Sequence, residues 1–161
     1  MTNFVFMSAS LLADQIAQRN LAGHLHRLSR YLGTLSEHRW ARDGYGDVRS
    51  GHVQLLRHLD PEGTRSSVLA QRAQVTKQTM GRLVKELAGS GYVAVAADPD
   101  DSRAGRVQLT ARGAAFLHYL AGTLTDLERV FAQVLGPDRL ADYMATTQVL
   151  LAFAEKRLLE L

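Results

Sequence analysis

Residues 69–87 read LAQRAQVTKQTMGRLVKEL, and their apolar residues fall into two short helical patterns separated by a break. The first pattern predicts a helix over about 66–73, with Leu69, Ala70 and Ala73 as its apolar positions. The second predicts a helix over about 77–90, with inward-facing Met80, Leu83, Val84 and Leu87. Only about three residues, around QVT, lie between them. Two helices joined by so short a turn predict a helix-turn-helix.

Two strand-like stretches follow the second helix, which Gly89 and Gly91 are expected to end. YVAVAA, at 92–97, and RVQLT, at 106–110, contain the β-branched and alternating residues of paired strands. The loop between them, ADPDDSRAGR, holds four acidic or turn-forming residues in a row, and Asp98 with Pro99 is expected to shape its turn. The sequence therefore predicts a β-hairpin with a long tip after the helix-turn-helix, which is a winged helix.

The segment before the helix-turn-helix predicts one more short helix. HVQLLRHL, at 52–59, follows the loop 41–51, and either Ser50 or Gly51 can cap it. DPEGT, at 60–64, contains the proline and glycine that end such a helix.

Both ends of the chain carry leucines at the three- and four-residue steps of helix packing, as in Leu21, Leu25, Leu28, Leu32 and Leu35. Two further striped helices are expected after residue 113, separated by Gly136 and Pro137. We therefore predict a mainly α fold with a small β-hairpin wing. Its regions are a dimerisation helix region at 1–47, the winged helix-turn-helix at 48–111 and C-terminal dimerisation helices at 112–161.

Charge is concentrated in the middle of the 161-residue chain. Residues 48–113 carry 10 Lys or Arg against 6 Asp or Glu, whereas residues 114–161 carry 4 against 6. A basic centre favours contact with nucleic acid in that region. The chain has no cysteine, no recognisable signal peptide and no apolar run long enough to cross a bilayer, which predicts a cytoplasmic protein.

Motifs of catalysis and metal binding are missing from the sequence. There is no glycine-rich phosphate loop and no G-x-S-x-G elbow, so we do not expect an enzyme or a bound cofactor. The pairs His24 with His26 and His52 with His58 are spaced two and six residues apart, which places them on different helix faces. No metal site is expected from these spacings.

The stretch 66–113 resembles the multiple antibiotic resistance regulator (MarR) family of bacterial transcription factors. The resemblance rests on LAQRAQVTKQTMGRLVKEL, the following GY, and DPDDSRAGRVQLTARG with its D-x-R at 101–103 and LT-x-x-G at 109–113. It implies a dimer held by the terminal helices, two winged helices on a palindromic operator in double-stranded DNA, and often a small-molecule effector.

The same resemblance assigns roles in the wing. Arg103 is expected to enter the minor groove, whose negative potential attracts a guanidinium, and Asp101 to support the wing and orient Arg103. Arg106 is included among the DNA-binding residues. Val95, Ala96 and Ala97 depart from the family, which often has basic residues just before this loop.

The second helix of the motif carries the expected recognition residues. Gln78 suits adenine and Arg82 suits guanine, whereas Lys77, Lys85 and Arg65 are expected to contact phosphates. Gly81 allows close approach to base edges, and Thr79 offers a methyl or hydroxyl group. Either Ser66 or Ser67 can give the preceding helix an N-terminus that favours anions.

Together these features predict a homodimeric, sequence-specific regulator, most often a repressor, released by an aromatic or phenolic effector. Arg27, Tyr31, Trp40 and His52 are candidate effector-binding residues. Two alternatives remain open: a metal-responsive regulator of the same fold, and a winged-helix protein-interaction module without an operator.

Overall fold

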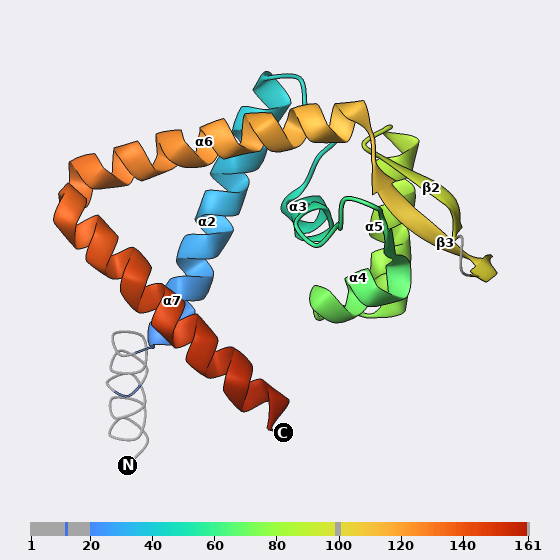
Figure 1. Cartoon of the computed structure of the whole chain (residues 1–161). Coiled ribbons are helices and arrows are strands. Elements are labelled where there is room, and N and C mark those ends of the chain that lie inside the picture. The colour runs from blue at the N-terminus through green and yellow to red at the C-terminus, as the bar shows by residue number, and fades with distance from the viewer. Residues whose placement is uncertain (1–11, 13–19, 99–100, 161) are drawn as a thin grey trace, which may run out of the picture. The chain divides into compact units, whose positions relative to one another are not determined.

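The computed structural model describes residue 12, residues 20–98 and residues 101–160; of residues 101–104 and 159 it describes the backbone only. The chain forms two compact units that divide between Thr110 and Ala111. As predicted, helices predominate and a small antiparallel sheet accompanies them (Figure 1). No helix in the described ranges has the length and apolar character needed to cross a membrane.

Helix α2, Leu21–Arg42, opens the described part of the first unit. Asn20 caps it, because its Oδ1 accepts a hydrogen bond from the backbone N–H of Gly23 at 2.8 Å. Trp40 is the buried residue of this helix. The predicted leucine stripe is instead largely exposed within the single chain, at Leu21, Leu25, Leu28 and Leu35.

Helix α3, Ser50–Leu56, begins differently from the prediction. Arg49 occupies the cap position, so neither Ser50 nor Gly51 caps the helix, and Ser50 is its first residue. Other side chains accept hydrogen bonds from the amides of the first turn: Glu37 Oε1 from Ser50 N–H at 2.7 Å and His52 Nδ1 from Arg49 N–H at 3.1 Å. The helix also ends earlier than the 52–59 stretch suggested.

Helices α4, Ser66–Arg72, and α5, Lys77–Gly89, form the predicted helix-turn-helix. Gln74 in the turn has a φ of 54°, a left-handed conformation that explains why glycine is common at this point of such turns. The turn closes through a hydrogen bond of 3.0 Å from Val75 N–H to the carbonyl oxygen of Ala70. Thr76 then caps α5, its Oγ1 accepting from Thr79 N–H at 3.1 Å.

The sheet has the strand order β1-β3-β2, with β1 Thr64–Arg65, β2 Val93–Asp98 and β3 Asp101–Leu109, all antiparallel. The hairpin is confirmed, but its predicted long tip is wrong, because β3 begins at residue 101 and not at 106. Gly105 allows this pairing to continue, since a Cβ there would lie 2.7 Å from Val95 Cγ1. The short strand β1 was not predicted.

The first unit has one apolar core between α3, α4, α5 and the sheet. Its fully buried side chains are Val48, Leu55, Leu69, Met80, Leu87, Tyr92 and Val107. The hydroxyl of Tyr92 donates a hydrogen bond of 2.6 Å to Asp47 Oδ1, so the polar end of this buried ring is satisfied. The core fixes which face of α5 points to solvent.

The second unit consists of α6, Ala111–Leu135, and α7, Pro137–Leu159. The predicted break at Gly136 and Pro137 is confirmed, and Gly136 has a φ of 84° that few other residues adopt. The two helices contact each other and diverge from this bend (Figure 1). Many large apolar side chains on them are exposed in the single chain, among them Leu124, Val134, Leu151, Phe153 and Leu158.

Candidate nucleic-acid interface

Helix α5 presents a polar face to solvent opposite its buried stripe. Met80, Leu83, Val84 and Leu87 are buried, as predicted. The residues of the opposite side are exposed: Lys77, Gln78, Gly81, Arg82, Lys85 and Glu86. Thr79 is half-buried next to the cap. Apart from its chain neighbours and the backbone of α5 itself, no described atom lies within 4 Å of a Cβ built on Gly81, so the space above this glycine is open.

Arg82 is held by an acidic neighbour that sequence reasoning did not assign. Its Nη1 donates a hydrogen bond of 2.6 Å to Glu86 Oε1, one helical turn later. The other carboxylate oxygen of Glu86 lies 2.8 Å from Nε2 of His52, a buried residue of α3. The hydrogen bonds from His52 and then from Arg82 hold the pKa of Glu86 below its ordinary value of 4.5, so this carboxylate is ionised at neutral pH.

A second acidic residue organises the base of the wing. Asp98 is buried, and its Oδ2 accepts from Arg65 Nε at 2.5 Å and lies 3.1 Å from Arg106 Nε. Arg65 and Arg106 are also cross-strand partners between β1 and β3. Two cations directly opposite each other repel, and the shared carboxylate offsets that repulsion. Asp98 therefore joins all three strands. The turn that Asp98 was predicted to shape with Pro99 lies at residues 99–100, outside the described part of the chain, so that role stays a prediction.

The structure describes only the backbone of Asp101 and Arg103. Asp101 and Arg103 both lie in β3, where Asp101 pairs with Asp98 across the hairpin. Their side chains, and Pro99, lie outside the described part of the chain. Ser66 is the first residue of α4, directly after Arg65 of β1.

The four candidate effector residues have different surroundings. Tyr31 and Arg27 are exposed on α2, and Trp40 is buried near its end. His52 is buried, with both ring nitrogens in hydrogen bonds. None of the four belongs to the lining of the pocket between α2 and the start of α3, a feature that the sequence did not suggest.

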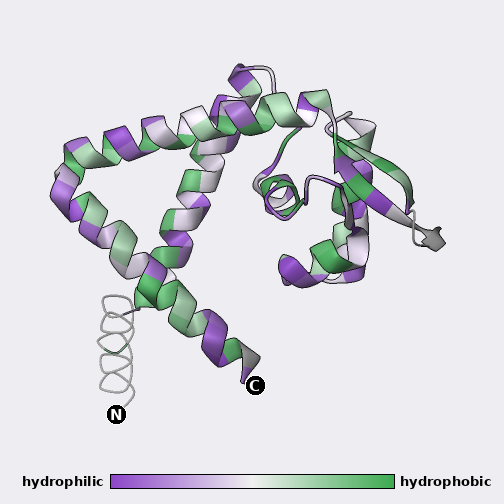
Figure 2. Cartoon of the chain, viewed as in Figure 1, coloured by the Kyte–Doolittle hydropathy of each residue, from purple (hydrophilic) through white to green (hydrophobic). Residues whose placement is uncertain are grey.

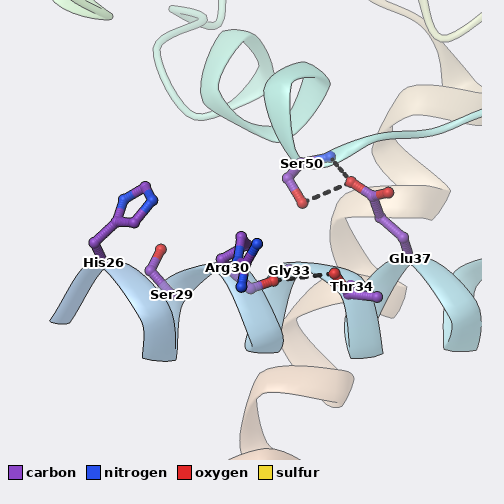
Figure 3. Close-up of a pocket in the computed structure, with 7 residues that line it drawn as sticks. All are labelled: His26, Ser29, Arg30, Gly33, Thr34, Glu37 and Ser50. Carbon is purple, nitrogen blue, oxygen red and sulfur yellow. Dashed lines mark hydrogen bonds between the residues drawn. The ribbon is translucent and has the colours of Figure 1, made fainter. Parts of the chain in front are cut away.

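This pocket has a volume of about 360 Å³ and is open to solvent on one side (Figure 3). Its lining residues are His26, Ser29, Arg30, Gly33, Thr34, Glu37 and Ser50. Glu37 Oε1 accepts from both the backbone N–H and the hydroxyl of Ser50, at 2.7 and 2.8 Å, which closes one end. The guanidinium of Arg30 lies over the Tyr31 ring, 5.3 Å from its centre. Tyr31 therefore contacts a lining residue without lining the pocket itself.

Within the described ranges, no three His, Asp or Glu side chains come together in a way that could hold a metal ion.

A buried helix-turn-helix core, an exposed basic helix and a three-stranded wing define a winged helix-turn-helix protein. Residues 47–104 match the sequence model described as the MarR family. We found no match among curated protein sequences.

Several solved structures share this fold. A crystal structure of MarR has 22% identity and a TM-score of 0.73, covering 84% of this chain and 98% of that one. FabT of Streptococcus pneumoniae, solved in complex with DNA, has 14% identity and a TM-score of 0.71, covering 86% and 98%. PcaV of Streptomyces coelicolor, solved with its natural ligand, has 23% identity and a TM-score of 0.60, covering 83% and 96%.

These findings confirm the resemblance drawn from the sequence. Residues 47–104 match the sequence model of the MarR family, and the chain shares its fold with solved MarR-family structures.

Proposed function

We propose that this chain is a homodimeric, sequence-specific DNA-binding regulator of transcription. The observation that carries the proposal is the exposed face of α5, where Lys77, Gln78, Arg82 and Lys85 stand opposite a buried apolar stripe. Such a helix fits the major groove and offers donors and acceptors to base edges. Two structures of the same fold, FabT and the Staphylococcus aureus MepR, were solved with DNA, which supports this use of the fold.

The proposed contacts divide by chemistry. Gln78 and Arg82 read base edges, with Gly81 and Thr79 beside them, because their side chains match adenine and guanine. Lys77 and Lys85 contact phosphates and supply salt-dependent affinity. Arg103, oriented by Asp101, enters the minor groove. Arg65, Ser66 and Arg106 belong to the same surface at the base of the wing, where Asp98 limits the freedom of both arginines.

The proposed dimer follows from apolar surface that a single chain leaves in water. Figure 2 shows apolar residues repeated along α7, and the exposed ones include Val149, Leu150, Leu151 and Phe153. Contiguous exposed apolar residues of this size are typical of protein interfaces. A closed dimer with two-fold symmetry requires a palindromic operator, with half-sites about one helical turn apart.

Selection of bound duplexes from a random DNA library tests this function with the full chain. We expect an enriched palindrome, bound more weakly as salt rises. Arg82→Ala should reduce the preference for one particular base pair in each half-site. Arg103→Ala should weaken binding to operators with A·T-rich flanks. The matched control is Glu160→Gln, which removes one charge from the exposed Arg157–Glu160 ion pair at the end of α7. It should change neither the base preference nor the binding to A·T-rich flanks. Absence of any enriched sequence would contradict the proposal.

We further infer that the chain is a repressor released by a small aromatic anion, such as a phenolate or aromatic carboxylate, in the pocket between α2 and α3. Arg30 supplies a cation at its wall, and Ser29 and Thr34 supply hydroxyl groups. The pocket reaches Ser50, the first residue of α3, so a ligand there contacts the helix that carries His52. PcaV, with the same fold, was solved with a natural ligand.

A panel of aromatic carboxylates and phenols, added to the protein bound to its selected duplex, tests the effector. At least one compound should release the DNA, and Arg30→Ala should abolish release while leaving DNA affinity unchanged. Arg42→Ala, which removes an exposed cation from the end of the same helix outside the pocket lining, serves as the control. Release of Arg30→Ala at the wild-type ligand concentration would rule out this pocket.

A further inference from the structure

His52 is a buried polar side chain whose two ring nitrogens have distinct partners. A backbone N–H can only donate, so His52 Nδ1 accepts the hydrogen bond from Arg49 N–H. In the neutral ring the proton is therefore on Nε2, which donates to Glu86 Oε2 at 2.8 Å. Core packing of α3 against α5 and these two bonds fix the imidazole, and the imidazole fixes one oxygen of Glu86.

Because His52 holds Oε2, the position of the second oxygen, Oε1, is also fixed. Arg82 Nη1 donates a hydrogen bond of 2.6 Å to Oε1. An ordinary exposed ion pair is weak, because two long side chains lose rotamer freedom to form it. Here Glu86 is already ordered by the buried histidine, so only Arg82 is restrained by forming the pair. A guanidinium has five N–H donors, and the contact with Glu86 uses one edge of the group.

A carboxylate on a DNA-facing surface also has a cost, because it repels phosphate. On the described outward face of α5, Glu86 stands among Lys77, Arg82 and Lys85 and lowers the positive charge there. This cost falls on all duplexes equally, since phosphates are the same in every sequence. A gain in discrimination at a single base pair offsets this general loss of affinity.

We propose that Glu86, held by His52, is a positioning residue that directs the Arg82 guanidinium at one base pair and thereby sets specificity. The inference rests on the proposed function. It makes two predictions of opposite sign: removing the charge of Glu86 strengthens binding to any duplex, and it weakens the preference for the base pair that Arg82 reads.

The test compares the wild-type full chain with Glu86→Gln, using fluorescence anisotropy. The probes are the selected operator, its single-base-pair variants and an unrelated duplex, each at two salt concentrations. In the wild type, His52 and Arg82 bind different oxygens of Glu86. A glutamine has an NH2 group in place of one of these oxygens, so it cannot keep both hydrogen bonds in the same geometry. At the base pair identified with Arg82→Ala, we expect discrimination to fall about five- to tenfold. Binding to the unrelated duplex should be tighter, and more so at the lower salt concentration.

Two further variants separate positioning from a general structural effect. His52→Gln keeps a side-chain donor toward Glu86 and should retain more discrimination than His52→Leu, with thermal unfolding measured for both. Glu160→Gln removes the same charge from the exposed pair on α7 and should leave discrimination as in the wild type.

The outcomes are distinguishable. Full discrimination in folded Glu86→Gln, or equal weakening at every base pair, would overturn the positioning role while leaving the DNA-binding function intact. A wild-type chain that selects no sequence at all would overturn both.

Discussion

Gln74 has a strained backbone conformation in the turn of the helix-turn-helix. Its φ of 54° lies in the left-handed region, where the Cβ of an L-residue crowds the following carbonyl oxygen. Its N–H still donates to the carbonyl of Gln71 at 3.1 Å, so the turn keeps its hydrogen bonds and the strain is confined to one backbone dihedral. Removing the Cβ should therefore relieve the turn without altering its contacts.

Gln74→Gly should raise the free energy of unfolding by about 0.5–1 kcal/mol, because relief of the left-handed conformation exceeds the added chain entropy of glycine. Urea unfolding followed by circular dichroism measures the change. Gln71→Gly, at an exposed position within α4, is the matched control and should lower stability by about 1 kcal/mol. A Gln74→Gly variant less stable than the wild type would show that the turn is not strained.

Gly81 is a different kind of glycine, since it lies inside α5 with open space above it. Gly81→Ala should raise stability by about 0.5–1 kcal/mol through helix propensity. The same methyl group should weaken operator binding by about 1–3 kcal/mol if base edges approach the helix closely at this point. Thermal unfolding and operator titration together measure the opposed effects. An alanine variant that gains stability and binds as well as the wild type would place Gly81 away from the DNA.

At the scale of elements, Asp98 links the three strands of the wing through Arg65 and Arg106. The two arginines are partly exposed, with 40% and 26% of their side chains accessible, whereas the Asp98 side chain is fully buried. Solvent therefore screens the cations, whereas the buried carboxylate is removed from water and placed against both arginines.

Asp98→Asn should destabilise the chain by about 1–3 kcal/mol, less than the loss for a wholly buried pair, because the two opposed arginines then lose the carboxylate between them. Chemical denaturation measures the loss, and hydrogen exchange at the amides of β3 should rise. Asp126→Asn breaks an exposed pair with Arg129 in α6 and should cost under about 1 kcal/mol. Equal losses in the two variants would mean that Asp98 does not organise the wing.

The helices of the motif could be predicted from sequence because apolar periodicity is a local signal. Met80, Leu83, Val84 and Leu87 are buried as the pattern indicated. Contacts between distant residues could not be predicted in this way: His52 and Glu86 are 34 positions apart, and Arg65 and Asp98 are 33 apart. The start of β3 at Asp101 also escaped prediction, since the polar stretch 101–106 has turn-like composition and pairs only through the hairpin register.

At the scale of the whole molecule, the exposed leucines of α2, α6 and α7 require a covering surface, which we propose is a second copy of the chain. Leu151→Asp, a position with half of its surface accessible, should convert dimers to monomers in sedimentation experiments while leaving helix content unchanged. Lys156→Asp on the same helix is an exposed control and should remain dimeric. A wild-type chain that sediments as a monomer at all concentrations would contradict this assembly.

In the proposed complex, two copies of α5 read two half-sites on one face of a duplex. The most direct test of this arrangement is operator affinity after insertion of about five base pairs between the half-sites, half a helical turn, which moves them to opposite faces of the DNA. The account predicts that this duplex binds hardly better than an unrelated one, and that insertion of a full turn restores part of the affinity. Equal affinity for the original and the half-turn duplex would contradict it.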